Sequence, residues 1–393
     1  MTVEEEAWAI LPYCNVCLGS TDPDYQTYNI AISGVVLALV GMIGLVGNMF
    51  VIMVYTSTEQ RVHSTSIYLA ALAVSDFCMI CTAMFLFVLE AWRHHGPPEL
   101  AYAYGIGAPL FFPLSAVFQT TSVYFCVAAA VDCFISVTLP SAFKEICCTA
   151  KKAKVVVLTM AICCSVYNIP HFFEIKAIEC VDVRYGGFHS LQICPTDFRL
   201  DALYYTVYYT YMYTTFMAVG PLLLLIVLNI FVVITVIRKG ASEDSDTISL
   251  ILVVFLFIFC NFTALLLNFL ELTLYEQLKH IIVYLVDLSN LLVVINCTAN
   301  FFVYVIFGNS FRRSLKQVCG IGGKPIAKGT ATNLIYAEDE THFVTRRLSS
   351  PSPTSSPSRS PPPPSTPLSP LTANGDMRRK KNEERKRKFF EKI

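Results

Sequence analysis

The sequence has little charge. Asp, Glu, Lys and Arg make up 15% of its 393 residues, whereas soluble globular domains carry roughly 25%. The formal net charge is zero, which gives no electrostatic reason to expect nucleic acid as a partner. Residues 1–28 lack the basic start and apolar core of a signal peptide, so we expect the first apolar span to direct insertion. No period of about 20 to 50 residues repeats along the chain, and its two halves show no inverted-repeat resemblance of the transporter kind.

Long apolar stretches, by contrast, are abundant. The mean hydropathy is +0.55, and a membrane-spanning helix needs about 20 predominantly apolar residues. The stretches of sufficient length are residues 29–55, 64–89, 102–137, 153–173, 203–237, 248–270 and 281–307. We therefore predict an all-α membrane protein, a seven-transmembrane helix bundle with a short amphipathic helix after the last span. The predicted domains are an extracellular N-terminus (1–28), the seven-span domain (29–319) and a disordered cytoplasmic tail (320–393).

Lysine and arginine in the loops predict the orientation, because cytoplasmic loops are enriched in these residues. With the N-terminus outside, ten of them lie on the inner side and five on the outer side. The inner ones are Arg61, Lys144, Lys151, Lys152, Lys154, Arg238, Lys239, Arg312, Arg313 and Lys316. The outer ones are Arg93, Lys176, Arg184, Arg199 and Lys279. We predict a multi-pass plasma-membrane protein with the N-terminus outside and the C-terminus in the cytoplasm.

The residues after the last span change character twice. The run FRRSLKQVC (311–319) is basic on one face and predicts an amphipathic helix along the inner surface. Cys319, at its end, is either a palmitoylation site or a free thiol. Residues 349–370 are rich in Ser and Pro and cannot form a packed core. The terminal run RRKKNEERKRKFF is either solvated or attracted to anionic membrane lipids.

Asp76 stands near the middle of the second apolar stretch. A carboxylate at that depth costs about 2.5–3.5 kcal/mol on insertion scales, so it marks a functional site that faces the bundle interior. Further polar side chains at a similar depth are Asn48, Ser122, Asn296 and Asn300. Carboxylate, hydroxyl and amide oxygens suit a small cation. They equally suit a hydrogen-bond network between helices, and the sequence leaves both interpretations open.

Motifs in the first, second and seventh spans occur in a familiar order. They are GN (47–48), LAVSD (72–76) and NCTANFFVYVIFGNSFRR (296–313). Together they resemble the rhodopsin-like class of G-protein-coupled receptors over residues 30–319. The resemblance implies a heterotrimeric G protein as partner and no cofactor other than an allosteric sodium ion. The implied sodium-site residues are Asp76, Ser122, Asn296 and Asn300.

Longer runs narrow the resemblance to one group of receptors. The runs are FQTTSVYF (118–125), YNIPHFFE (167–174), CPTDFRLDALYY (194–205), NFTALLLNFLE (261–271) and LSNLLVVINCTANFFVY (288–304). They are similar to invertebrate receptors for FMRFamide-type neuropeptides. The similarity implies an extracellular, amidated neuropeptide as the ligand, and it places Phe262 at the aromatic switch position of the sixth span.

The chain departs from the family pattern where the receptor transmits its state. Asp132, Cys133 and Phe134 stand where the family has Asp-Arg-Tyr, while Tyr304 keeps the tyrosine of the seventh span. The missing arginine would pair with the aspartate and contact the G protein, and a thiol does neither. Ala264 also replaces the proline that kinks the sixth span. The alternative function is therefore a receptor-shaped peptide-binding protein with weak or no G-protein coupling.

Most of the 15 cysteines lie in apolar runs, where a thiol acts as a small hydrophobe. No cysteine lies between Cys81 and Cys126, so the family's disulfide from the third span lacks its usual partner. The cysteines on the outer face are Cys14, Cys17, Cys180 and Cys194. Four cysteines in an oxidising compartment allow three pairings. The resemblance implies a bond from Cys194 either to Cys180 or to an N-terminal cysteine.

A peptide that ends in Arg-Phe-amide carries a cation and an aromatic ring, which carboxylates and aromatic walls bind. The outer ends of the spans supply three carboxylates, and the third span supplies two polar side chains at greater depth. The predicted ligand-binding residues are Glu90, Ser115, Gln119, Phe262, Glu271 and Asp287. Tyrosines at a membrane interface and solvated rim acids would give a similar pattern, so both interpretations stay open.

Other functional classes lack the residues that they need. A retinal protein needs a lysine in the seventh span, and none lies between His280 and Phe311. An enzyme needs a nucleophile with a base or a metal cluster, and the histidines and Cys147-Cys148 have no such spacing. A channel or transporter is disfavoured by the odd number of spans. We therefore predict a neuropeptide receptor that is not an enzyme.

Overall fold

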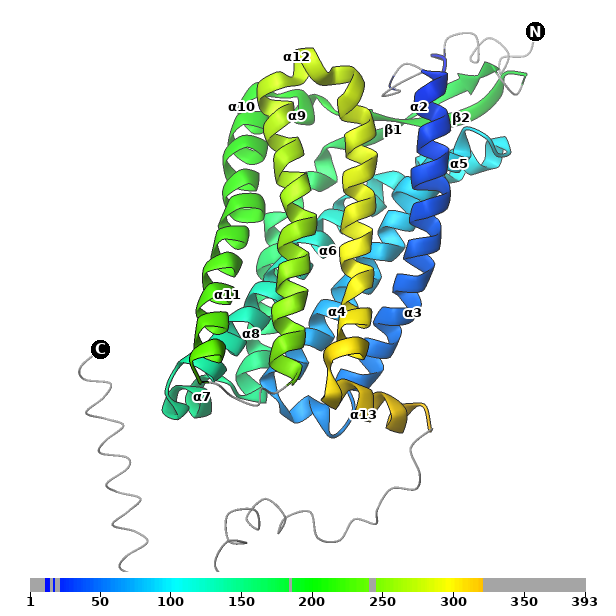
Figure 1. Ribbon diagram of the computed structural model, residues 1–393. Coiled ribbons are helices and arrows are strands. Elements are labelled where there is room, and N and C mark those ends of the chain that lie inside the picture. The colour runs from blue at the N-terminus through cyan, green and yellow to red at the C-terminus, as the bar shows by residue number, and fades with distance from the viewer. Residues whose placement is uncertain (1–10, 15–16, 18–21, 184–185, 240–244, 321–393) are drawn as a thin grey trace, which may run out of the picture. The chain divides into compact units, whose positions relative to one another are not determined.

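The computed structural model describes residues 11–14, 17, 22–183, 186–239 and 245–320. Within these ranges, the side chains at positions 239, 245–246, 264, 268, 271–277 and 279 are outside the description. Helices that are long and apolar enough to cross a membrane are Pro23–Tyr55, Ser64–Arg93, Pro98–Thr138, Ala150–Phe173, Ala202–Arg238, Thr247–Leu267 and His280–Phe307. The predicted bundle of seven spans is thus confirmed, and Figure 1 shows the helices running side by side.

The first three spans each begin near one end of the bundle and cross to the other. The first consists of α2 (Pro23–Asn29), η1 (Ile30–Val36) and α3 (Leu37–Tyr55). After η2 (Gln60–Val62), the second consists of α4 (Ser64–Ala83), η3 (Met84–Leu89) and α5 (Glu90–Arg93), and the third is α6 (Pro98–Thr138). The segments η1 and η3 are wound as π-helix and continue the α-helices around them.

The remaining spans are built in the same way. After α7 (Ser141–Cys147) come α8 (Ala150–Tyr167) and η4 (Ile169–Phe173) as the fourth span. After α9 (Asp197–Leu200), the fifth span consists of α10 (Ala202–Tyr204), the π-helical η6 (Tyr205–Val219) and α11 (Gly220–Lys239). The sixth and seventh spans both belong to α12 (Ser245–Phe307), and α13 (Asn309–Val318) follows as the predicted short helix.

The first helix starts at Pro23, six residues before the predicted start of the span. Asp22 caps it, because its carboxylate accepts a hydrogen bond from the Asp24 amide at 3.0 Å. Proline is favoured at the first helical position, where its missing N–H is not needed. The polar segment Asp24–Thr27 therefore extends the first span, although its composition is typical of a loop.

A two-stranded antiparallel hairpin stands at one end of the bundle, and the sequence did not predict it. It consists of β1 (Ile175–Asp182) and β2 (Phe188–Pro195). Figure 1 shows it at the end opposite α13, and these two ends are called the hairpin end and the α13 end below. Its turn contains Gly186 and Gly187 with φ of 69° and 87°, values that glycine adopts without strain.

Two neighbouring segments pack against this hairpin. On one side, Tyr13 pairs with Val181 as a short parallel bridge, and the Val181 amide donates to the carbonyl of Pro12 at 2.9 Å. On the other side β2 lies on α6, where a Cβ at Gly105 would lie 2.4 Å from Cβ of Leu191. The N-terminal segment and the third span therefore hold the hairpin between them.

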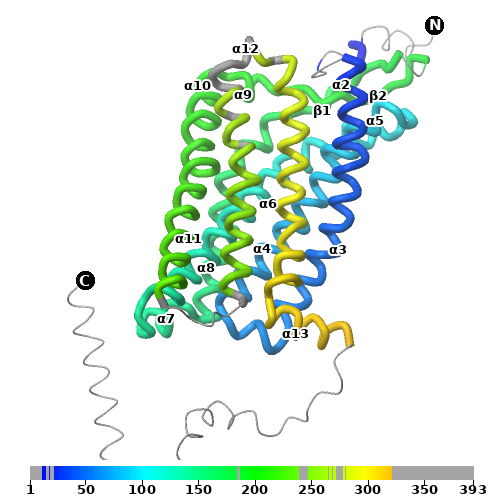
Figure 2. The backbone as a smooth tube through the Cα atoms, in the orientation of Figure 1, coloured from blue at the N-terminus to red at the C-terminus, as the bar shows by residue number. Residues whose placement is uncertain are grey.

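The core lies around α6. In the most apolar window of that helix 67% of the residues are buried, whereas the figure is 17% for the span formed by α8 and η4. Apolar side chains of α3, α4, α11 and α12 pack against α6 or against each other, with Val51, Leu72, Ala129, Leu225 and Val254 buried among them. The third span is therefore the central helix and the fourth is peripheral (Figure 2).

Candidate functional site

Two neighbouring cavities lie in the half of the bundle that ends at the hairpin. The larger has a volume of about 430 Å³ and the smaller about 270 Å³. Leu86, Phe87, Tyr104 and Asn290 line both of them, so the cavities share a wall. Volumes of this size suit small ligands or individual side chains of a peptide.

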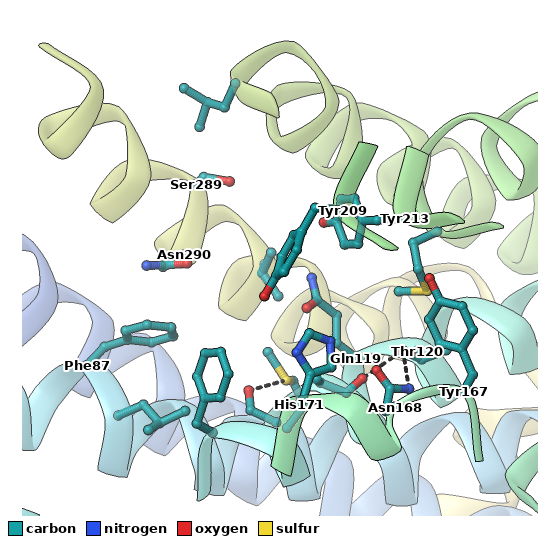
Figure 3. A pocket seen from close by; sticks show the side chains of 18 of the residues that line it. Phe87, Gln119, Thr120, Tyr167, Asn168, His171, Tyr209, Tyr213, Ser289 and Asn290 are labelled. Carbon is teal, nitrogen blue, oxygen red and sulfur yellow. Dashed lines mark hydrogen bonds between the residues drawn. The ribbon is translucent and has the colours of Figure 1, made fainter. Parts of the chain in front are cut away.

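The larger cavity is aromatic with convergent polar groups. Ser115 and Gln119 of α6 line it, as do His171 of η4 and Tyr209 of η6. Figure 3 shows the side chains of Gln119, His171 and Tyr209 turned toward one space. Asn168 completes this wall, since its Nδ2 donates to Thr120 Oγ1 at 2.9 Å and to the carbonyl of Cys164 at 2.7 Å. The cavity offers hydrogen-bond donors and acceptors beside ring faces.

The smaller cavity is acidic. Glu90 and Asp287 line it together with Asn29. Glu90 already has cationic neighbours, because its Oε1 lies 3.2 Å from an Arg93 nitrogen and 3.3 Å from His94 Nε2. Asp287 is 6% exposed and accepts from Asn29 Nδ2 at 3.0 Å. Among the described residues no cation pairs with Asp287, so this carboxylate is the one best placed to receive a cation from a ligand.

The structure thus brings four of the predicted ligand-binding residues into two adjacent cavities. Ser115 and Gln119 line the larger one, and Glu90 and Asp287 line the smaller one. Phe262 lines neither, because it lies on the outer side of α12 with 55% of its surface exposed. The geometry therefore does not place Phe262 in contact with a ligand in either cavity. The side chain of Glu271 is outside the described residues.

A carboxylate that sequence reasoning missed organises the wall of the larger cavity. Glu174, just after η4, is fully buried. It accepts from Tyr204 Oη at 2.6 Å, from Tyr209 Oη at 2.5 Å and from an Arg199 nitrogen at 3.1 Å. His171 Nδ1 lies 2.8 Å from the same carboxylate. Burial alone would raise the pKa of Glu174, but His171 and the two tyrosine hydroxyls hold it below its usual range.

These residues occur in sequence runs that carried the family resemblance, YNIPHFFE and CPTDFRLDALYY. Periodicity could not identify them, since Glu174 and Arg199 lie in connections between spans and are 25 residues apart. The available signal was the presence of both signs of charge next to aromatic residues in two connecting segments.

The central polar cluster forms around Asp76, which has no exposed surface. Ser122 Oγ donates to Asp76 Oδ1 at 2.5 Å, and Asn300 Nδ2 donates to Oδ2 at 2.8 Å. Asn48 and Asn296 are also buried, but neither forms a hydrogen bond with Asp76 among the described residues. Asn48 donates instead to the carbonyl of Cys297 at 3.0 Å. The cluster therefore ties the second, third and seventh spans together.

Three asparagine oxygens lack a hydrogen-bond donor among the residues that the structure describes. They are Oδ1 of Asn48, Asn296 and Asn300, all buried. An unsatisfied buried oxygen costs free energy, and a hard cation takes oxygens of this kind as ligands. The residues present therefore fit a sodium ion beside Asp76. The predicted sodium-site residues Ser122 and Asn300 contact the carboxylate, whereas Asn296 supplies an unpaired oxygen.

The predicted switch residues lie at the α13 end. Among the described residues no arginine pairs with Asp132, and its Oδ2 accepts from Ser64 Oγ at 2.9 Å and from Thr65 Oγ1 at 2.7 Å. Hydroxyl groups at the start of α4 thus take the place of a cation. Cys133 is buried, and the ring of Phe134 packs edge-on against Phe231 with their centroids 6.1 Å apart.

Three further residues lie at the α13 end. Tyr304 is buried and packs against Tyr55 and Phe311, and its hydroxyl has no hydrogen-bond partner in the described part of the chain. Cys148 donates through Sγ to the carbonyl of Asp132 at 3.7 Å, and burial raises the pKa of this thiol to about 12. Cys319, predicted as a lipidation site, is exposed at the end of α13.

The outer cysteines form two disulfides, Cys14–Cys180 and Cys17–Cys194. Of the two predicted alternatives for Cys194, the bond to an N-terminal cysteine is confirmed, and the predicted bond to Cys180 is wrong. The strand register explains why. Cys180 is paired with Ser190 and Cys194 with Lys176, so the two cysteines lie four positions apart along the hairpin. That distance is about 13 Å, and disulfides need Cα atoms within about 7 Å.

Comparisons with known proteins agree with this architecture. The model of the 7 transmembrane receptor (rhodopsin family) matches residues 47–304. The probable G-protein coupled receptor frpr-1 of Caenorhabditis elegans is 40% identical over 75% of this chain and 80% of its own length. The FMRFamide receptor of Drosophila melanogaster is 28% identical over 72% of this chain and 52% of its own length.

A third relative, the FMRFamide peptide receptor frpr-18 of Caenorhabditis elegans, is 26% identical over 71% of this chain and 67% of its own length. The family consists of receptors and not of enzymes, in agreement with the prediction from the sequence. The matched residues include Asp76, Asp132 and Tyr304. By the family match and by its relatives, this chain belongs to the rhodopsin family of seven-transmembrane, G-protein-coupled receptors.

Proposed function

We propose that this receptor binds an amidated, FMRFamide-like neuropeptide and transmits binding to a heterotrimeric G protein. One observation carries the proposal. An acidic cavity, with Asp287 lacking a cationic partner among the described residues, shares a wall with a larger aromatic and polar cavity. An arginine followed by phenylalanine-amide offers a cation to the acidic cavity. It offers an aromatic ring and a carboxamide to the larger cavity. The names of two relatives specify FMRFamide, which supports this ligand class.

In this proposal the arginine side chain enters the smaller cavity and pairs with Asp287. Glu90 is the secondary acid, because Arg93 and His94 already occupy one of its oxygens. The phenylalanine ring passes Phe87 and Tyr104 on the shared wall and enters the larger cavity. Ser115 and Gln119 form hydrogen bonds with the C-terminal carboxamide of the peptide.

We further propose that the hairpin end faces the outside of the cell at the plasma membrane, with the C-terminus in the cytoplasm. Two disulfides support this orientation, since such bonds persist in oxidising compartments. The excess of Lys and Arg in the loops of the other side supports the same orientation. Palmitoylation of Cys319 and contacts of the basic C-terminal run with anionic lipids belong to this proposal as well.

Sodium is the proposed allosteric ion of the central cluster. Asp76, Ser122 and Asn300 would hold it, with the unpaired amide oxygens of Asn48 and Asn296 in support. A bound sodium ion supplies a positive charge next to the carboxylate. Without the ion, Ser122 and Asn300 donate hydrogen bonds to Asp76, and they connect the third and seventh spans through it.

G-protein coupling in this receptor has to proceed without the family's arginine in the third span. The hydrogen bonds from Ser64 and Thr65 to Asp132 link the second and third spans in this region. The relatives are described as receptors, which supports signalling over the alternative of a binding protein that does not couple. The test is a cell assay that measures peptide binding and G-protein activation on the same preparation.

Replacing Asp287 by Asn is expected to weaken FMRFamide binding about 30-fold or more. Truncating one partner of a buried charge pair in an interface costs about 2–5 kcal/mol, and each 1.4 kcal/mol is tenfold. Competition binding with the purified receptor measures the change. A peptide with citrulline in place of arginine keeps the shape but lacks the charge, so its affinity should be the same for both receptors.

The matched control is Asp197→Asn, at an exposed carboxylate of the same end that lines neither cavity. This variant should bind FMRFamide like the unaltered receptor. An equal loss of affinity for the arginine and citrulline peptides in Asp287→Asn would contradict the proposed pairing, because it would show that Asp287 acts through the fold.

A further inference from the structure

Arg199 places a permanent positive charge on the wall of the larger cavity. It is the only Lys, Arg, Asp or Glu among the described residues that line this cavity. Its guanidinium carbon lies 5.6 Å from the ring centre of Phe112 and 5.8 Å from that of Tyr209. The two rings hold the group against the wall. An uncompensated guanidinium in this place would bind a carboxylate through paired hydrogen bonds.

Glu174 compensates that charge from behind the wall. Its side chain is fully buried and does not line the cavity, whereas the Arg199 side chain is 37% exposed. The ion pair between them is 3.1 Å long. Tyr204 and Tyr209 donate to the two oxygens of the same carboxylate, so its position is fixed by three separate elements. The pair therefore presents hydrogen-bond donors to the cavity without a net charge.

The two cavities consequently differ in charge. The smaller one contains Glu90 and Asp287. Arg93 and His94 contact Glu90, and among the described residues no cation pairs with Asp287. The larger one contains Arg199, balanced by Glu174. A ligand that fits both must be cationic at one side chain and neutral at the group that faces Arg199. A C-terminal carboxamide meets the second condition, and a C-terminal carboxylate is attracted only where Arg199 is uncompensated.

We propose that Glu174 makes the receptor selective for an amidated peptide over the corresponding free acid, because it neutralises Arg199 on the wall that receives the peptide C-terminus. This inference rests on the proposed function, an Arg-Phe-amide ligand, and assigns the group that recognises the amide. Glu174 is a positioning and charge-setting residue, and Arg199 is the residue that contacts the ligand.

The experiment compares FMRFamide with the free acid Phe-Met-Arg-Phe in competition binding. Both peptides are measured in the same buffer at the same pH. In Glu174→Gln, the affinity ratio of amide to acid should fall by about tenfold or more, because the freed guanidinium gains a charge-assisted hydrogen bond to the carboxylate. In Arg199→Gln the ratio should rise instead, since Glu174 then lacks its cation. In the double variant the wall is neutral again, and the ratio should return toward that of the unaltered receptor.

Glu179→Gln is the matched control, because Glu179 lies on β1 of the same hairpin with 64% of its side chain exposed. It should leave the ratio unchanged. An unchanged ratio in Glu174→Gln or in Arg199→Gln, in a receptor that still binds FMRFamide, would overturn this inference and leave the proposed function intact. The opposite shifts of the two single variants distinguish charge from misfolding, which would lower both affinities together. Absence of binding of both peptides to the unaltered receptor would refute the proposed function, and this inference with it.

Discussion

Joint replacement of Cys14 and Cys17 by serine is expected to abolish peptide binding at physiological temperature, whereas each single replacement leaves a receptor that binds. The two disulfides connect positions 166 and 177 residues apart. In the chain-entropy account, closing a loop of this length is worth about 5 kcal/mol. Loss of both bridges removes this contribution and that of the second bridge.

The second bridge contributes less than the first because the first has already closed the long loop. Once Cys14 is joined to Cys180, the bond from Cys17 to Cys194 closes only a ring of fewer than about 20 residues, worth about 3 kcal/mol. Each single loss should therefore cost about 3 kcal/mol, and the joint loss about 8 kcal/mol. The joint effect exceeds twice the single effect, as expected for two crosslinks that share one loop.

Thermal unfolding of the detergent-solubilised receptor, followed by retained peptide binding, measures these differences. Cys81→Ser is the matched control, since Cys81 is a free and exposed cysteine of the second span. It should leave the stability unchanged. A joint variant no less stable than the single variants would show that the hairpin is held by its packing on α6 at Gly105 and not by the bridges to the N-terminal segment.

Replacing Asp76 by Asn is expected to abolish the dependence of peptide affinity on sodium. Coupling between two sites usually changes affinity by about 5- to 150-fold, and the unaltered receptor should show a change in this range when sodium replaces a large organic cation. Asparagine keeps the size of the side chain and an oxygen that accepts from Ser122 or Asn300. It removes the negative charge, without which the site does not hold a monovalent cation.

Competition binding in sodium chloride and in N-methylglucamine chloride at equal ionic strength makes this measurement. Asp24→Asn, at an exposed carboxylate of the first helix, should retain the response of the unaltered receptor. A sodium response that persists in Asp76→Asn would show that Asp76 serves only the hydrogen-bond network. The unpaired amide oxygens of Asn48, Asn296 and Asn300 would then need another explanation.

Local pattern in the sequence identified the features that depend on neighbouring residues. The spans follow from apolar length, and α13 follows from the basic face of residues 311–319. Asp76 was identified because one carboxylate in an apolar stretch is costly at any place in a bundle. Ser115 and Gln119 were predicted as polar side chains at greater depth on the third span, and both line the larger cavity.

Features of the connecting segments required the tertiary structure. The hairpin has no simple alternation of apolar and polar residues, since its strands lie between α6 and the N-terminal segment. Phe262, predicted from a family position, lines neither cavity, because its place on α12 leaves 55% of its surface exposed. Which face of α12 is exposed depends on the packing of the whole helix.

The sequence by itself determined the seven spans, the family, the buried carboxylate at Asp76 and the acids of the smaller cavity. Only the tertiary structure decided that Cys17 bonds Cys194, that hydroxyls of Ser64 and Thr65 hold Asp132, and that Glu174 neutralises Arg199. The physical reason is one of distance along the chain. Burial and helical period depend on residues within a few turns, whereas a disulfide or an ion pair depends on where two separate segments meet after the helices have packed.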